Sequence, residues 1–166
     1  MSGQALSGQT ALVTGAGNGL GRAIALALGA HGCQVIAAGR SAERLAETAE
    51  LLRAGGAQAH WATCDVTAPA SVQALAQRFA DAGVSILINN AGTGGPVAEL
   101  VEIDPVDWDE VFAVDVRGTY LMCRALLPSM LAAVEEEEVA QAVIAMLSVK
   151  GLCGADIDLS AGMVAF

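Results

Sequence analysis

The chain has 166 residues, about the length of one domain, and 54% of them are hydrophobic while 16% are charged. This composition excludes intrinsic disorder, because it supplies ample apolar surface to offset the entropy of the chain. The whole formal net charge of −10 lies after residue 98, so the chain lacks the basic face that a nucleic-acid partner requires.

The first 130 residues alternate short apolar runs with longer amphipathic stretches. The short runs are bounded by turn-forming residues and predict strands at residues 11–14, 34–38, 59–64 and 85–89. The longer stretches have apolar residues at helical spacing and predict helices at residues 20–30, 42–54 and 70–82. This order predicts an α/β fold, a doubly wound parallel sheet of Rossmann type with helices on both faces.

The second part of the chain departs from this alternation. One long helix is predicted over residues 107–130, entered through a turn at Asp104 and Pro105. A helix at residues 135–147 follows directly, and the acids at 135–138 suit its first turn better than a metal site. Residues 156–160 predict a final strand, which leaves the parallel sheet short at its C-terminal half.

The segment TGAGNGLG, residues 14–21, lies between the first predicted strand and the first predicted helix. Gly15, Gly19 and Gly21 permit a tight turn, close approach of the backbone to a pyrophosphate and close packing of the helix on the strand. Amides at the start of the helix can hold phosphate oxygens. Because strand and helix flank it, the loop indicates nucleotide binding rather than a flexible turn, the alternative for an isolated glycine-rich loop.

The spacing TGxxxGxG, with NNAG at residues 89–92 and CDV at residues 64–66, resembles the short-chain dehydrogenase/reductase family. The resemblance runs from about residue 6 to residue 130 and returns in residues 134–166. It implies a single dinucleotide-binding domain over residues 1–166. It also implies an oxidoreductase that transfers hydride between NADP or NAD and a small carbonyl or alcohol substrate. A methyltransferase with a similar sheet is disfavoured, because NNAG and Arg40 have no role in one.

The resemblance assigns cofactor contacts at the ends of three predicted strands. The pyrophosphate contacts would come from the glycine-rich loop, through Gly15, Asn18, Gly19, Leu20 and Gly21. Asp65 would bind the adenine with Val66 beside it, although a turn residue that caps the next segment is the alternative for Asp65. The ribose and nicotinamide side would be lined by Asn90, Ala91 and Gly92.

The end of the second predicted strand bears on the choice of cofactor. An acid there would bind the ribose 2′-hydroxyl and repel a 2′-phosphate, but this chain has Gly39, Arg40 and Ser41. A guanidinium and a hydroxyl favour the phosphate of NADP, with NAD as the second choice. The alternative is that Arg40 is a solvated loop charge and Ser41 only a helix N-cap.

The family's chemistry uses a Ser, a Tyr and a Lys four residues after the Tyr. This chain has one Tyr and one Lys, Tyr120 and Lys150, and they are too far apart to form that pair on one helix. Tyr120 is expected to pack within the long helix, where aromatic packing is the usual role. Asp115 stands where the family has an Asn and is the catalytic candidate, with an exposed helix acid as its alternative.

The family's segment with the catalytic Ser, Tyr and Lys is thus missing between Ala133 and Val134. We expect either an impaired oxidoreductase or a catalytically silent NADP-binding or subunit-interaction protein. Residues 156–160 are expected beside residues 85–89, in this chain or a second copy. An uncovered apolar stripe on the long helix is expected to favour a homodimer or higher homo-oligomer, through Val111, Val114, Gly118, Leu121 and Ala125.

Membrane and redox signals are weak in this sequence. Arg124 and Pro128 interrupt the longest apolar run before it reaches the ~18 residues of a membrane span. The first ten residues lack an export signal, so we expect a cytoplasmic protein without a membrane partner. The cysteines lack metal-ligand spacing and are expected to be reduced and mostly buried: Cys33, Cys64, Cys123 and Cys153.

Overall fold

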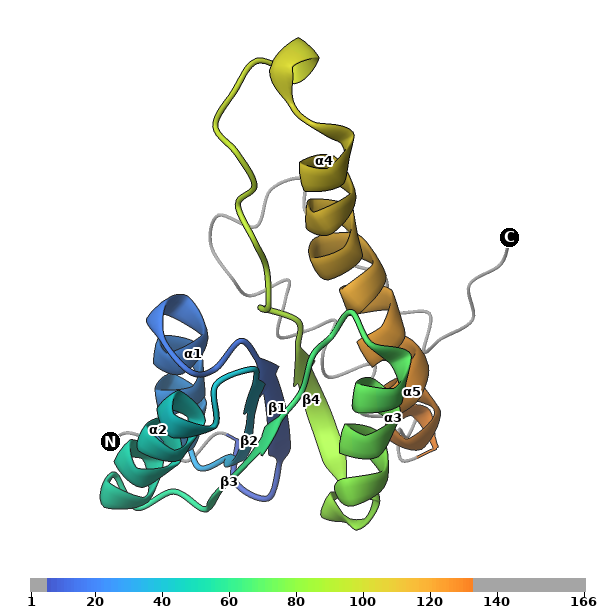
Figure 1. Cartoon of the computed structure of the whole chain (residues 1–166). Coiled ribbons are helices and arrows are strands. Elements are labelled where there is room, and N and C mark those ends of the chain that lie inside the picture. Colours follow the sequence, from blue (N-terminus) through green and yellow to red (C-terminus); the bar gives the residue numbers. More distant parts are fainter. Residues whose placement is uncertain (1–5, 133–166) are drawn as a thin grey trace, which may run out of the picture.

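A four-stranded parallel sheet forms the centre of the computed structural model, which describes residues 6–132 (Figure 1). Its strands, in the order β3-β2-β1-β4, are β1 (Thr10–Thr14), β2 (Gln34–Gly39), β3 (Ala59–Thr63) and β4 (Val84–Ile88). All three pairings are parallel. The predicted fold class is therefore confirmed, and each strand lies within one residue of its predicted bounds.

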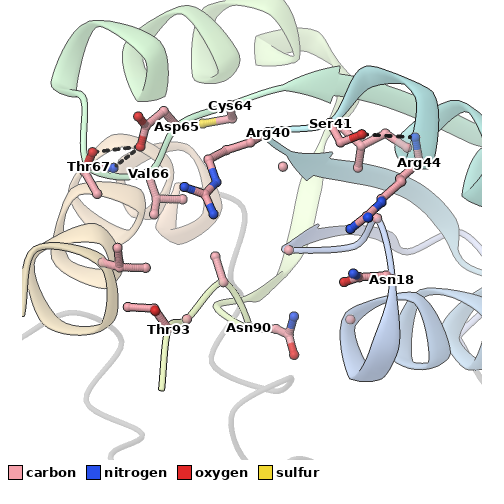
Figure 2. Close-up of a pocket in the computed structure, with 18 of the residues that line it drawn as sticks. Asn18, Arg40, Ser41, Arg44, Cys64, Asp65, Val66, Thr67, Asn90 and Thr93 are labelled. Carbon is pink, nitrogen blue, oxygen red and sulfur yellow. Dashed lines mark hydrogen bonds between the residues drawn. The ribbon is translucent and has the colours of Figure 1, made fainter. Parts of the chain in front are cut away.

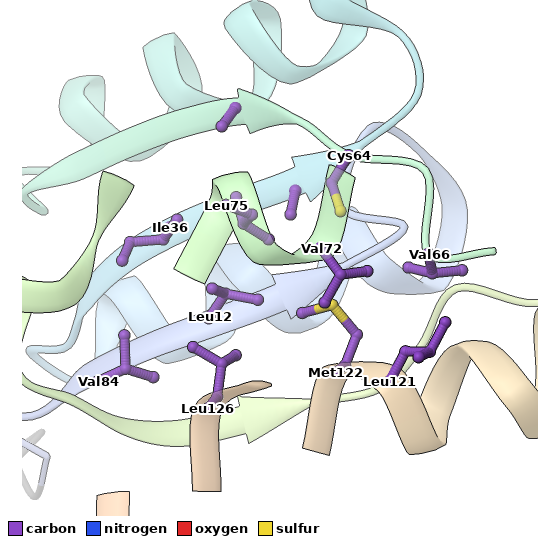
Figure 3. Close-up of a cluster of buried hydrophobic side chains, with 12 residues drawn as sticks. Leu12, Ile36, Cys64, Val66, Val72, Leu75, Val84, Leu121, Met122 and Leu126 are labelled. Atoms are coloured by element: carbon purple, nitrogen blue, oxygen red, sulfur yellow. The ribbon is translucent and has the colours of Figure 1, made fainter. Parts of the chain in front are cut away.

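Helices cover both faces of this sheet. One face carries α1 (Gly19–Ala30) and α2 (Ala42–Ala54), and the other carries α3 (Pro69–Arg78) and α5 (Thr119–Leu131) (Figure 1). Alternate strand residues point to opposite faces, so Leu12 packs with the α3 and α5 side while Val13 packs with the α1 and α2 side. Figure 3 shows the first of these clusters, with Met122 of α5 set against the sheet. Burial on both faces explains why the strands are almost continuously apolar.

The helix predicted over residues 70–82 is shorter than expected. α3 ends at Arg78, and Ala80–Ala82 form a separate 3-10 turn. Gly83 follows with φ 61°, a left-handed conformation that glycine adopts without steric cost, and the chain turns there into β4. The prediction missed this break because Gly83 lies just beyond the apolar pattern.

The helix predicted over residues 107–130 is also not one regular α-helix. It begins as α4 (Pro105–Val111), where Asp104 accepts a hydrogen bond from the Val106 amide at 2.8 Å, as expected of the predicted entry turn. A π-helical segment, Phe112–Gly118, then separates α4 from α5. Apolar spacing of three and four residues does not distinguish α from π turns, so this segment could not be predicted from the sequence.

The apolar stripe expected to be uncovered faces the chain's own core instead. Gly118 and Leu121 are buried, and Val114 and Ala125 pack against the cluster on the α3 and α5 side of the sheet. The prediction of an exposed stripe is therefore wrong, because a regular apolar period marks the helix face that meets its own sheet. Large apolar side chains are exposed on a different face, at Trp108, Phe112, Val116 and Tyr120.

Three other expectations concern the edge of the sheet, the thiols and membranes. Within residues 6–132, β4 has a neighbouring strand on one side only, and the predicted elements at 135–147 and 156–160 lie outside the described residues.

Cys33 and Cys64 are buried free thiols, as predicted, and burial raises the pKa of both. Cys123 is half-buried, and Cys153 lies outside the described residues. None of the described helices is long and apolar enough to cross a bilayer.

Gly29 is expected to contribute to stability by letting α1 pack closely on α2. A Cβ there would lie 2.6 Å from Leu52 Cδ2 and 3.0 Å from Ala57 Cβ. Overpacking costs ~1–3 kcal/mol and the gain in helix propensity returns ~1 kcal/mol. The net loss is centred on ~1 kcal/mol, so Gly29→Ala should lower the melting temperature by about 2–4 °C. Gly94→Ala is the control, because its added methyl meets no atom within 4 Å. Equal melting temperatures for the two variants would contradict this account.

Candidate functional site

The loops that follow the four strands border one cleft of ≈ 790 Å³, within the range of small-molecule sites (Figure 2). The cleft lies beyond the carboxyl ends of the strands, where the chain crosses from β3 back past β1 to β4, and open α/β sheets bind ligands at such a reversal. Of the residues predicted to bind a cofactor, all but Gly19 line this cleft: Gly15, Asn18, Leu20, Gly21, Arg40, Ser41, Asp65, Val66, Asn90, Ala91 and Gly92.

The glycines of the loop after β1 are required by its geometry. Gly15 has φ +66°, and a Cβ there would lie 2.8 Å from Asn90 Nδ2. A Cβ on Gly21 would overlap the carbonyl oxygen of Gly15. Gly19 has φ +50°, and a Cβ there would meet no atom within 4 Å, so glycine is required at this position by the turn and not by packing. The loop therefore approaches both the loop after β4 and the start of α1 more closely than any other residue type allows.

The start of α1 presents hydrogen-bond donors beside this loop. Asn18 is the N-cap residue, but its side chain makes no capping hydrogen bond and lines the cleft (Figure 2). The first amides of a helix have no partner within the helix. Together with the positive end of the helix dipole, they make this loop a suitable site for phosphate oxygens.

Thr14, at the end of β1, joins the two sides of the cleft. Its hydroxyl donates to the Ile88 carbonyl at 3.2 Å and accepts from the Asn90 and Ala91 amides, each at 3.0 Å. The Asn90 side chain donates back to the Thr14 carbonyl at 3.0 Å. Thr14 was not among the residues predicted to act at the cleft. Its place in the sequence was informative, because a hydroxyl at the end of a buried strand must find hydrogen-bond partners.

Arg22 is a second residue whose contacts near the cleft were not predicted. From α1 it donates to the Gly17 carbonyl at 2.6 Å, to Thr48 Oγ1 at 3.0 Å and to Glu47 at 2.7 Å. Thr48 is buried and donates to the Ala16 carbonyl at 3.0 Å. These bonds fasten the glycine-rich loop to α2. An arginine in an amphipathic helix is ordinarily a surface charge, so the sequence alone did not distinguish it.

The loop after β2 brings two guanidinium groups to the cleft. Arg40 and Arg44 both line it, and Gly39 stands where an acid would bind a ribose hydroxyl (Figure 2). Ser41 is the N-cap of α2, and its hydroxyl accepts a hydrogen bond from the Arg44 amide at 3.4 Å. This is the helix-capping role that was the alternative to phosphate binding. Arg44 was not predicted, although its place in the first turn after Ser41 was visible in the sequence.

Asp65, after β3, is an ionised acceptor at the cleft. Its Oδ1 accepts from the Thr67 hydroxyl at 2.7 Å and the Thr67 amide at 2.9 Å. These bonds lower the pKa of Asp65, and the nearby charge of Arg40 lowers it further. Asp65 therefore makes the turn contact weighed as its alternative role. Because both bonds use Oδ1, the carboxylate keeps acceptor capacity at Oδ2 for a ligand.

Neither Asp115, the predicted catalytic candidate, nor Tyr120 lines the cleft. Asp115, in the π-helical segment, accepts a hydrogen bond from the Thr93 amide at 2.9 Å. Tyr120 is 56% exposed, and Arg124 donates to its hydroxyl at 3.4 Å, so it is not the packed aromatic that was expected. Lys150 lies outside the described residues. The described part of the cleft is thus equipped to hold a ligand more clearly than to exchange a proton with one.

Known proteins are similar to this chain in sequence and in fold. Residues 9–157 match the family model of the short chain dehydrogenases. An uncharacterised oxidoreductase of Bacillus subtilis is 39% identical over 132 residues, covering 76% of this chain and 47% of the relative. The D-threitol dehydrogenase of Mycolicibacterium smegmatis is 40% identical over 131 residues, covering 77% of this chain and 50% of that protein.

Two solved structures with NADP bound resemble the described fold. A metagenomic short-chain oxidoreductase superposes with a TM-score of 0.73 at 37% identity, covering 78% of this chain and 59% of the other. The 3-oxoacyl (acyl-carrier-protein) reductase of Agrobacterium tumefaciens superposes with a TM-score of 0.71 at 34% identity, covering 78% and 50%. The chain spans about half the length of the curated relatives it matches. With this sheet, these motifs at its strand ends and these matches, the chain belongs to the short-chain dehydrogenase family.

Proposed function

We propose that the chain binds NADP in the cleft at the carboxyl ends of its strands. The observation that carries this proposal is the combination of a glycine-rich loop at the start of α1 with Arg40 and Arg44 at the end of β2, all lining one cleft. The first group suits a pyrophosphate and the second a 2′-phosphate. The two solved relatives that hold NADP support the same choice.

Different lining residues contact different parts of the ligand. Gly15, Asn18, Leu20 and Gly21 surround the pyrophosphate, and the α1 amides donate to its oxygens. Arg40 and Arg44 pair with the 2′-phosphate, while the Ser41 hydroxyl keeps its proton to donate. Asp65 accepts from the adenine amino group beside Val66. The ribose and nicotinamide lie along Asn90, Ala91 and Gly92.

The reaction of this family is the second part of the proposal. The nicotinamide, when bound, supplies or accepts a hydride, and a carbonyl or alcohol is the substrate class. The chain's own contribution is to orient the ring. It has no Tyr-x-x-x-Lys pair to move the accompanying proton, so the ancestral oxidoreductase activity is impaired. The second candidate, a catalytically silent NADP-binding or subunit-interaction protein, is favoured by the same observation.

The first prediction of this proposal is that NADP binds more tightly than NAD. Arg40→Ala should weaken NADP binding by about 1–3 kcal/mol and leave NAD almost unchanged, because only NADP carries the charge that Arg40 pairs. Isothermal titration calorimetry of both cofactors measures this. Arg78→Ala is the control, because Arg78 is an exposed arginine of α3 outside the cleft. Equal affinities of the unchanged protein for both cofactors would contradict the proposed preference.

The second prediction concerns turnover. A positioned general acid or base contributes ~10²- to 10⁴-fold, so hydride transfer by this chain should be slow with common alcohols and ketones even when NADP is bound. The oxidation or reduction of the nicotinamide, followed by absorbance, measures the rate alongside a family member that has the Tyr and Lys pair. A rate equal to that of the complete relative would refute the impairment.

We also propose that two copies pair through the outer helical face, defined as Trp108, Phe112, Val116 and Tyr120. These side chains recur every four residues, are 44–57% exposed, and the Trp108 and Phe112 rings stack with centroids 4.8 Å apart. The acids Asp104, Asp107 and Asp109 lie near the start of this face and Arg124 near its end. An antiparallel pair would set the acids of one copy against the arginine of the other.

This pairing predicts a concentration-dependent dimer. Val116→Glu places a charge in the middle of the outer helical face and should convert the dimer to monomer in sedimentation or light-scattering measurements. Leu51→Glu is the matched control, because Leu51 is 44% exposed on α2, away from that face. A protein that is monomeric before any substitution, or a dimer that survives Val116→Glu, would rule out this interface.

A further inference from the structure

Two loops that line the cleft are tied to the same short segment of the long helix. The segment is the π-helical stretch Phe112–Gly118, between α4 and α5 (Figure 1). One loop, residues 65–67, follows β3, and the other, residues 92–93, follows β4. π turns are rare and frequently occur at functional sites, so the groups that this segment holds bear on the function of the cleft.

Arg117 is connected to the carboxylate of Asp65 through Thr67. Arg117 Nη1 donates to the Thr67 carbonyl at 3.0 Å. The amide and hydroxyl of Thr67 in turn donate to Asp65 Oδ1, at 2.9 and 2.7 Å. Thr67 therefore binds the helix through its carbonyl and Asp65 through its amide and hydroxyl, and Figure 2 shows the bonds to Asp65. The Arg117 bond therefore holds Thr67, the residue that fixes the direction of the Asp65 carboxylate.

Gly118 brings the helix and this loop into close contact. It is buried, and a Cβ at its position would lie 2.8 Å from Cγ2 and 3.2 Å from Cβ of Val66. Val66 also lines the cleft and belongs to the cluster shown in Figure 3. The Arg117 bond is thus made across a packed contact, where small movements of the helix are passed to the loop.

Asp115 holds the second loop. Its Oδ1 accepts from the Thr93 amide at 2.9 Å, and a Cβ on Gly92 would lie 3.3 Å from the same oxygen. The carbonyl of Asp115 is itself satisfied by the Thr119 hydroxyl at 2.9 Å. The carboxylate therefore has a defined partner in the loop that lines the cleft after β4.

We infer that Arg117 and Asp115 are positioning residues, which set the two loops of the cleft from one π-helical segment. Arg117 acts on the adenine side through Thr67 and Asp65, and Asp115 acts on the nicotinamide side through Thr93. This inference rests on the proposed function for the identity of the ligand. Both bonds lie among exposed groups and so contribute little to folding, which makes the position of the loops their main effect.

Binding to the full-length chain separates the two roles, with adenosine 2′,5′-bisphosphate as a probe for the adenine side and NADP for the whole cleft. Arg117→Ala should weaken both probes by about three- to tenfold, the value of one net hydrogen bond. Asp115→Ala should weaken NADP by a similar factor and leave the bisphosphate unchanged. Asp115→Asn keeps an oxygen acceptor and should retain NADP affinity, and Arg78→Ala is the control for loss of an exposed arginine.

Amide hydrogen exchange of the cofactor-free protein gives a readout that does not depend on the ligand. Arg117→Ala should speed exchange at the Thr67 amide and leave the rate at the Thr93 amide unchanged. Asp115→Ala should speed exchange at the Thr93 amide and leave the rate at the Thr67 amide unchanged. If Arg117→Ala or Asp115→Ala changes neither the exchange rate of the expected amide nor the affinity for the expected probe, the positioning role of that residue is overturned. The role of Asp115 is also overturned if Asp115→Asn loses as much NADP affinity as Asp115→Ala. If the unchanged protein binds neither probe, the proposed function fails, while the exchange rates still decide whether the segment holds the loops.

Discussion

The buried hydroxyl of Thr14 satisfies a constraint on which the rest of the cleft depends. The loop after β1 must approach the loop after β4 so closely that a Cβ on Gly15 would meet Asn90 Nδ2 at 2.8 Å. Such an approach brings backbone amides out of water, and each must find a partner. Thr14 supplies one oxygen to both the Asn90 and Ala91 amides and donates its own proton to Ile88. The side chain thus replaces the strand pairing that ends at this point.

The same constraint accounts for the contacts around the cleft. Each loop leaves the sheet and loses its ladder of hydrogen bonds, and in three of the four a side chain from a neighbouring helix supplies a replacement. Arg22 holds the loop after β1, Arg117 the loop after β3 and Asp115 the loop after β4. All three come from helices whose opposite faces are packed on the sheet. The positions of the loops are therefore set by the core, although the loops themselves are largely exposed.

The elements of the fold could be predicted from the sequence where the pattern was local. The strands are short, apolar and bounded by turn-forming residues, and the motif glycines occupy positions where backbone geometry demands them. The π-helical segment Phe112–Gly118 and the covered face of α5 could not be predicted in this way. A π turn and an α turn share the same apolar spacing, and which helix face is covered depends on where the helix is placed over the sheet.

The candidate site shows the same division between local and distant contacts. The loop motifs indicated the residues that line the cleft, but the residues that hold the loops after β3 and β4 are 50 and 22 positions away in the sequence. Arg117 bonds to a backbone carbonyl, which every residue type has, and Asp115 to a backbone amide, which every type except proline has. The identity of the partner therefore leaves no trace in the sequence. A side chain that acts through a backbone atom can be found only once the fold has placed the two together. For that reason the Asp115 carboxylate suggested acid chemistry in the sequence and a contact with the Thr93 amide in the structure.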